Sequence, residues 1–247
     1  MHDLLVINPN TSASVSGLLQ HHVQRALGDY WRVRTVTARF GAPYISDEAG
    51  YAVAAHATLD AWSAALPLAS PHAVLIGCFG DPGLFALRES SPVPVGGLAE
   101  AAFTEAARHG RFAIVTGGER WKPMLQRLAH SLGQGTALAG IHTVAPTGAQ
   151  LAADPAAARA LLAQACRDAA RLFSADAVVL GGAGLAGMAA EIQTEVGVAV
   201  IDSVLAGARW AAQAIVDTDP NAGRNAPGFD VPWNGLSAEM TALGLPG

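Results

Sequence analysis

Cys78 stands where a cysteine could take up and return a proton. It follows an apolar run at residues 73–77, within the glycine-rich stretch GCFGDPG and ahead of the helical pattern LFALRES. This order predicts a buried strand, a turn and a helix, which puts Cys78 at the carboxyl end of a strand, where parallel sheets bind ligands. A helix N-terminus there favours the thiolate, the reactive form of cysteine. We predict that Cys78 is catalytic; a buried structural cysteine is the alternative.

The other cysteine, Cys166, has a different setting. It falls in a long helical pattern at residues 155–173, which begins with Asp154 as cap and Pro155 as first residue. Leu162 and Ala169 share its apolar face, so we predict that Cys166 belongs to the core. Two cysteines make no disulfide framework, and a reducing compartment would leave Cys78 as a thiol.

Polar residues follow another predicted strand, at residues 4–8. Asn8, Asn10, Thr11 and Ser12 lead into a helical pattern that one of them can cap. Capping does not account for both asparagines around Pro9. We therefore predict that Asn8 and Asn10 can face a ligand at the strand end.

An internal repeat positions these residues. Residues 4–8 precede the similar run 73–77 by 69 positions, and residues 112–116 precede 177–181 by 65 positions. A short strand, PVPV or VAVI, follows each pair. We predict an α/β fold with two pseudo-symmetric halves, each a mostly parallel sheet flanked by helices, with the active site in the cleft between them. The first half would comprise residues 1–96 and 205–247, the second residues 97–204. Cys78 and Gly182 would occupy equivalent positions on opposite walls.

A dinucleotide site is the main alternative reading of the late glycines. Gly182, Gly184 and Gly187 spell GxGxxG after an apolar strand, and Asp202 lies 20 positions beyond the first of them. Only residues 188–195 can form a helix before the next strand. That is too short for the usual crossover, so a tight turn explains these glycines better.

Composition restricts the class of partner. Hydrophobic residues make up 51% of the chain, charged residues 14%, and the net charge is −5 without any basic stripe. We predict a cytoplasmic protein that acts on a small-molecule substrate and binds neither nucleic acid nor membrane. The eight histidines lack metal-ligand spacing, so no metal is predicted. Phe229 and Trp233 in the tail, with the low charge, favour a homo-oligomer.

Three motifs resemble one known family. INPNTS near the start, GCFGDPG in the middle and VLGGAGLAGM late in the chain are similar to the Asp/Glu/hydantoin racemase superfamily, closest to its hydantoin and allantoin racemase branch. The resemblance implies a cofactor-free enzyme in which two cysteines face each other across the substrate. Cys78 matches the first cysteine. Gly182 stands where the family motif places the second, and Gly117 stands where relatives usually have a threonine.

The implied activity is that of a racemase or epimerase acting on a carbon acid next to a carbonyl, such as C5 of a hydantoin or allantoin, or an amino acid. Cys78 would exchange the proton. We assign the enolate charge to backbone N–H groups of Phe79, Gly80, Ala183 and Gly184, with the side chains of Asn8, Asn10 and Thr116. Further expected substrate-binding residues are Thr11, Ile45, Asp81 and Gly117. A one-cysteine decarboxylase or isomerase of the same superfamily and a non-catalytic binding protein are the alternatives. A cysteine at position 182 would be strained if Gly182 has a positive φ.

Overall fold

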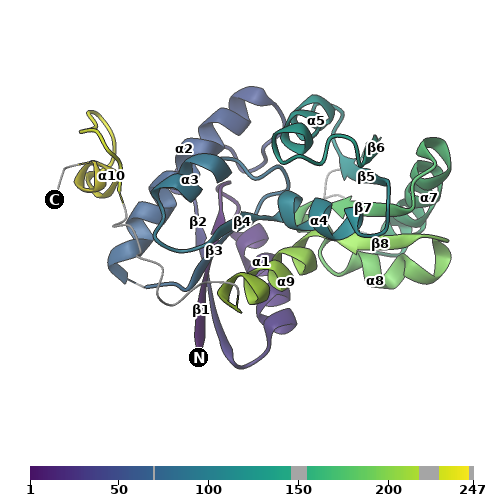
Figure 1. Ribbon diagram of the computed structural model, residues 1–247, viewed down its shortest axis with the longest axis horizontal. Coiled ribbons are helices and arrows are strands. Elements are labelled where there is room, and N and C mark those ends of the chain that lie inside the picture. Colours follow the sequence, from purple (N-terminus) through teal and green to yellow (C-terminus); the bar gives the residue numbers. More distant parts are fainter. Residues whose placement is uncertain (69, 146–154, 217–227, 245–247) are drawn as a thin grey trace. The chain divides into compact units, whose positions relative to one another are not determined.

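Two four-stranded parallel sheets form the framework of the protein. A computed structural model describes residues 1–68, 70–145, 155–216 and 228–244 (Figure 1). The strand orders are β2-β1-β3-β4 and β6-β5-β7-β8, so the two sheets have the same topology. This confirms the predicted α/β fold with two similar halves, each a parallel sheet flanked by helices.

The chain divides into two compact units. Unit 1 contains residues 1–77, 81–97 and 209–247, and unit 2 contains residues 78–80 and 98–208. Residues 78–80 thus lie between two segments of unit 1 in the sequence but are grouped with unit 2. Cys78 therefore packs with the half that begins twenty residues later in the sequence.

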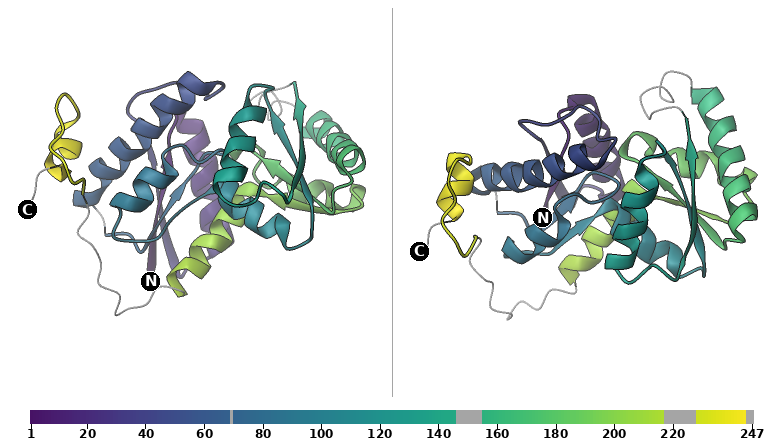
Figure 2. Two further views of the ribbon diagram at one scale, coloured as in Figure 1. Left: turned by 45° about the horizontal axis from the view of Figure 1, so that its top comes forward. Right: turned by 90° about the horizontal axis from the view of Figure 1, so that it is seen from above.

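Unit 1 is built on strands whose pairing matches the sequence repeat. Its elements are β1 (His2–Asn8), α1 (Ala13–Leu27), β2 (Trp31–Thr37), α2 (Glu48–Ala65), η1 (Leu66–Leu68), β3 (Ala73–Ile76), α3 (Leu84–Ser90), β4 (Val95–Gly97) and α10 (Ala238–Leu243). Leu4 pairs with Ala73, the offset of 69 positions found in the sequence. The sheet is buried between helices, with α1 and α2 packed on β1 and β2 (Figure 2). Four of the five residues 4–8 are apolar because both faces of the strand are covered.

Unit 2 repeats this arrangement. Its elements are α4 (Leu98–Ala107), β5 (Phe112–Gly117), α5 (Trp121–Ser131), β6 (Leu138–Val144), α7 (Pro155–Phe173), β7 (Ala177–Gly181), η2 (Ala183–Leu185), α8 (Met188–Ile192), η3 (Gln193–Glu195), β8 (Ala199–Asp202) and α9 (Ser203–Val216), the last of which ends in unit 1. Phe112 pairs with Ala177 and Thr116 with Gly181, again at the offset found in the sequence, here 65 positions. Pro155 is the first residue of α7, as predicted. Asp154, the predicted cap, lies outside the described residues.

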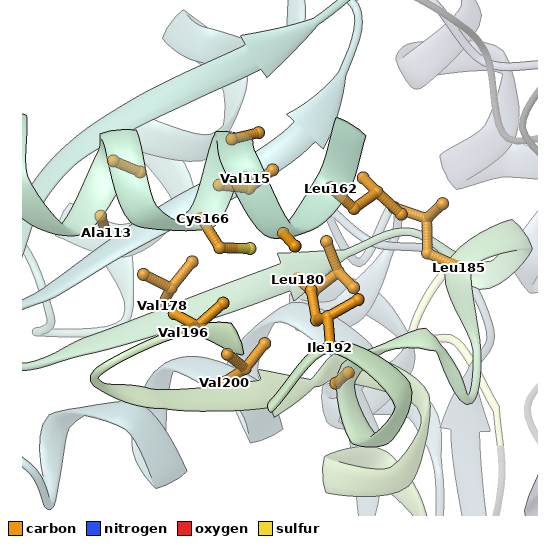
Figure 3. Close-up of a cluster of buried hydrophobic side chains, with 14 of the residues drawn as sticks. Ala113, Val115, Leu162, Cys166, Val178, Leu180, Leu185, Ile192, Val196 and Val200 are labelled. Carbon is orange, nitrogen blue, oxygen red and sulfur yellow. The ribbon is translucent and has the colours of Figure 1, made fainter. Parts of the chain in front are cut away.

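One face of the second sheet carries the hydrophobic cluster shown in Figure 3. Alternate residues of β5 and β7 point into it, among them Val115, Val178 and Leu180, and meet the apolar face of α7. Cys166 lies in the middle of this cluster and is fully buried. The prediction that Cys166 is a core residue is confirmed.

The C-terminal segment around α10 is fastened to α2 within unit 1. Arg39 donates to the Asp60 carboxylate at 2.7 Å and to Glu239 at 3.0 Å. Burial alone would raise the pKa of the Asp60 carboxyl, but the hydrogen bonds from Arg39 and Ser237 outweigh it and lower that pKa. The aromatic tail is also packed inside this unit. The ring of Phe229 lies 6.3 Å from Trp62 and 5.5 Å from Trp233. A homo-oligomer stays a prediction.

No helix among the described residues is long and apolar enough to cross a bilayer.

Candidate functional site

Cys78 lies in the turn that follows β3. Its exposed fraction is 9%, and the segment of residues 78–80 is fixed by the rings around it. The ring of Phe79 packs edge-on against Phe103 at 5.9 Å. The Cα of Gly80, at φ 128°, lies so close to Trp121 that an added Cβ would come within 2.5 Å of the indole. These contacts hold the backbone on both sides of the thiol in one conformation.

Gly182 occupies the equivalent turn after β7. Its φ is 141°, a conformation that favours glycine, and its N–H donates to the hydroxyl of Ser203 at 3.3 Å. An added Cβ would meet only the Leu185 side chain, at 3.7 Å, so the space beside Gly182 is open. Because φ is positive, a cysteine at this position would be strained by the backbone, although there is room for its side chain.

The two turns are neighbours within unit 2. Phe79 directly follows Cys78, and its ring lies on the Cα of Gly181, where an added Cβ would come within 2.2 Å of it. Gly181 directly precedes Gly182. Cys78 and Gly182 are therefore each one residue from a pair in close contact, and glycine at 181 is what allows that approach.

Backbone donors are available beside the thiol. Among the described residues, no acceptor is found for the N–H groups of Phe79, Ala183 and Gly184. Ala183 and Gly184 open the short helix η2, where the first N–H groups have no partner within the helix. Such donors can bind the negative oxygen of an enolate. These N–H groups are among those that the sequence analysis assigned to binding the enolate.

Thr116 serves the second turn as a fastening. Its hydroxyl donates to the carbonyl oxygen of Gly181 at 2.9 Å and is buried. That proton is not available to a substrate while this bond exists. Gly117, the next residue, ends β5 and is partly exposed. Thr116 therefore acts on the site by holding the backbone in front of Gly182.

Asn8 and Asn10 form a network at the end of β1 in unit 1. The Asn8 amide donates at 3.0 Å to Asn10 Oδ1, to the Ser12 carbonyl and to the Ser16 hydroxyl, of which two can be served at once. Asn10 Oδ1 also accepts from the Ser12 N–H at 2.9 Å. Ser12 caps α1, as predicted. The Asn10 Nδ2 group has no partner among the described residues, so it remains able to donate to a ligand.

The other predicted binding residues of unit 1 differ in accessibility. Thr11 is partly exposed, and its N–H donates to the Ala42 carbonyl at 3.1 Å. Ile45 is 4% exposed and packs beside the start of α2. Asp81 is 1% exposed at φ 53°, with its carboxyl group against the Cα of Gly97. Asp81 is thus packed into the turn, and its role in substrate binding stays a prediction.

The Asp202 carboxylate binds backbone N–H groups and has a structural role. One carboxylate oxygen accepts from the N–H of Gly187 at 2.7 Å, and the other accepts from Val204 and Leu205 at 2.9 and 3.1 Å. Asp202 thus ties the turn to the end of β8 and caps α9. The helix after the glycines, α8, has five residues, which confirms the short helix expected there. All of these bonds would compete with a ribose for the carboxylate.

Cys166 is unsuited to acid-base work at neutral pH. Desolvation raises the pKa of its thiol to about 12, with only a small opposing effect from Arg167. No clustering of three or more His, Cys, Asp or Glu side chains fit to hold a metal ion occurs within the described ranges. Cys78 is therefore the cysteine that remains for proton transfer.

Sequence reasoning missed Ser203 and Trp121. Ser203 is 1% exposed and reaches Gly182, and Trp121 supports Gly80. A serine that opens a helix is ordinarily a capping residue, and a tryptophan after a glycine turn is ordinarily a core residue. The internal repeat could have pointed to Ser203, because it aligns β8, which precedes Ser203, with β4, which pairs with the strand before Cys78.

Known proteins resemble this chain over most of its length. A family model described as Asp/Glu/Hydantoin racemase matches residues 4–211. A hydantoin racemase from Pseudomonas sp. (strain NS671) is 32% identical over 213 residues, which are 86% of this chain and 85% of the relative. A hydantoin racemase from Paenarthrobacter aurescens is 32% identical over 209 residues, 84% of this chain and 89% of the relative.

Among solved structures, the allantoin racemase from Klebsiella pneumoniae has the same fold. The TM-score is 0.85 at 28% sequence identity, and the match covers 98% of this chain and 99% of that chain. The sequence relatives and this structure agree on a single family.

Proposed function

This chain belongs to the Asp/Glu/hydantoin racemase family, and from that premise we propose that it is a cofactor-independent racemase or epimerase with Cys78 as its proton-transfer group. The substrate class is a carbon acid next to a carbonyl, with a 5-substituted hydantoin or allantoin as the first candidates. The names of the similar proteins support this choice of substrate. The homologous match spans the strands and turns of both halves, including the turns of Cys78 and Gly182.

One observation carries the proposal. Cys78 follows a parallel strand at the position that Gly182 holds after the matching strand, and open backbone donors lie beside both. A thiolate at that place removes the proton on the α-carbon. The resulting enolate oxygen accepts hydrogen bonds from the N–H groups of Ala183 and Gly184, or of Phe79. The thiol formed in the first step can return the proton to the same face.

The glycine at position 182, where the family motif has its second cysteine, favours one other candidate function. Gly182 carries no acid, so proton return from the Cys78 side alone would preserve the configuration of the substrate. A one-cysteine decarboxylase or isomerase uses such one-sided protonation. A malonate substrate tests it: release of CO₂ with a single enantiomer formed would support the decarboxylase, and binding of hydantoins without any exchange would support a binding protein.

The test of the main proposal is deuterium exchange in heavy water. The parent protein should exchange the C5 hydrogen of a 5-substituted hydantoin above the uncatalysed rate, measured by loss of the proton NMR signal. Cys78→Ala should lower the exchange rate by about 10²–10⁴-fold, the usual weight of a positioned acid-base group. The matched control is Cys166→Ala, which removes the other thiol and should leave the exchange rate unchanged. Equal exchange by the parent and a folded Cys78→Ala variant would refute the role of Cys78.

A further inference from the structure

The second turn contains a buried hydroxyl with an unused proton. Ser203 Oγ accepts from the N–H of Gly182 at 3.3 Å, and its side chain is 1% exposed. Within the described part of the chain, the Ser203 hydroxyl donates to no acceptor. Buried hydroxyl groups normally donate as well as accept, so this proton is available to an oxygen that the described residues do not supply.

The room for that oxygen lies beside Gly182. Two other glycines of these turns, Gly80 and Gly181, have their Cβ directions blocked by aromatic rings at 2.5 and 2.2 Å. At Gly182 the nearest side-chain atoms are those of Leu185 at 3.7 Å. No atom besides those two of Leu185 lies within 4 Å of the Cβ position among the described residues, so Ser203 Oγ, which contacts the Gly182 N–H, leaves this side of Gly182 open for a small polar molecule.

The pairing of the strands shows which residue of the first repeat corresponds to Ser203. Ile76 pairs with Gly97, and the matching Leu180 pairs with Asp202, so Ser203 corresponds to Leu98. The residue after β4, the strand that pairs with β3, is thus apolar, whereas the residue after β8, the strand that pairs with β7, carries a hydroxyl group. A polar group is present only where the thiol is missing.

Resting on the proposed function, we propose that Ser203 is a positioning residue that holds a water molecule beside Gly182, and that this water protonates the enolate on the face opposite Cys78. Cys78 thiolate first takes the α-proton and becomes a thiol, leaving the enolate. The water then gives one proton to the α-carbon and becomes hydroxide. The hydroxide recovers a proton from the Cys78 thiol through solvent, which restores the water and the thiolate. Inversion thereby becomes possible without a second cysteine.

The proposal separates two rates that a merely structural role would change together. In heavy water, deuterium exchange at C5 reports proton removal by Cys78, and decay of optical rotation reports protonation on the opposite face. Ser203→Ala should lower the ratio of inversion to exchange by about tenfold, the weight of one hydrogen bond, with exchange itself retained. Ser63→Ala is the matched control, because the buried Ser63 hydroxyl donates to the Leu59 carbonyl at 2.8 Å in α2. It should change neither rate.

Each other outcome has a definite meaning. An unchanged ratio in Ser203→Ala overturns the inference and leaves the proposed function intact. Equal loss of both rates shows that Ser203 only holds the Gly182 backbone and also overturns it. Exchange without any inversion in the parent excludes a protonating water beside Gly182. Failure of the parent to exchange hydrogen at all refutes the proposed function, and this inference with it.

Discussion

The turn after β3 and the turn after β7 end in the same left-handed glycine conformation and differ in the residue that opens them. Gly83, at φ 85° and ψ 4°, and Gly187, at φ 86° and ψ −20°, are left-handed residues that each precede a helix. Each lies five positions beyond its counterpart at the front of the turn, Cys78 or Gly182. The repeated halves thus bend the chain at the same place, while only the turn after β3 carries a thiol.

The same turns are fastened from opposite sides. In unit 1 the carboxyl group is on the turn, where Asp81 lies against Gly97 at the end of β4. In unit 2 it is on the strand end, where Asp202 accepts from Gly187 on the turn. Each arrangement pairs an aspartate with a glycine: Gly97 leaves room for the Asp81 carboxyl group, and Gly187 donates its N–H to Asp202. The two halves therefore hold equivalent turns with an aspartate each, which lies on the turn itself in one case and at the end of the neighbouring strand in the other.

The largest expected effect comes from closing the space on the Asp81 side. Gly97→Ala places a Cβ within 2.1 Å of the Asp81 carboxyl carbon, and Asp81 is buried. We expect a loss of about 3 kcal/mol in the free energy of unfolding, the upper end of the usual cost of overpacking, measured by urea denaturation.

Two further variants sharpen this prediction. Gly97→Ala combined with Asp81→Gly should be less destabilised than the sum of the single variants, because the overlap is removed. Gly17→Ala in α1 is the control, since no atom lies within 4 Å of the added Cβ. It should stabilise the protein by about 0.5–1 kcal/mol. A Gly97→Ala variant as stable as the parent would show that the contact between Asp81 and Gly97 does not stabilise the first turn as the Asp202 hydrogen bonds stabilise the second.

Removing the fastening of the second turn should cost somewhat less. Asp202→Ala removes three hydrogen bonds from backbone N–H groups, at Gly187, Val204 and Leu205. We expect a loss of about 2–3 kcal/mol, which combines a lost helix cap with a lost charge-assisted bond. Asp202→Asn should fall in between, because its amide oxygen can still cap α9 while its NH₂ group cannot accept from Gly187.

The surface residue Asp168 provides the control for this series. Asp168→Ala removes a single pair with Arg171, at 2.6 Å on the exposed side of α7, and should change stability by less than about 0.5 kcal/mol. Equal stability of the Asp202→Ala and Asp168→Ala variants would contradict the structural role of Asp202.

Apart from the control variants, the smallest effect on stability is expected at Gly182. Gly182→Cys and Gly182→Ala should each lose about 1–2 kcal/mol, because φ is 141° while the space is open. Only the cysteine variant should racemise a 5-substituted hydantoin faster than the parent, since it alone adds an acid on this side. Optical rotation decay measures it, with the alanine variant as control. Equally slow decay in both variants, with the new thiol titratable, would show that this turn is not a second catalytic wall.

The sequence predicts the framework better than the contacts at its edges. The offsets of 69 and 65 positions foretell the strand register, because a repeated apolar run pairs in parallel with its neighbour. Cys78 and the donors at Ala183 and Gly184 follow from that register. The positive φ of Gly182 and the contact from Ser203 do not, because they depend on how β8 delivers α9 to the turn. The contact of Asp81 with Gly97 likewise depends on how the turn after β3 folds over the end of the neighbouring strand β4.

The ring of Phe79 also sets an order of assembly. Phe79 is made early, but the Gly181 surface on which it rests is synthesised 102 residues later. At about 5–20 residues per second, the ribosome needs about 5–20 s to supply that surface. The first sheet can form in this interval with the Cys78 segment still unanchored. The Cys78 thiol therefore reaches its final surroundings only after the second sheet has been synthesised, so the proposed site cannot be assembled from the first sheet alone.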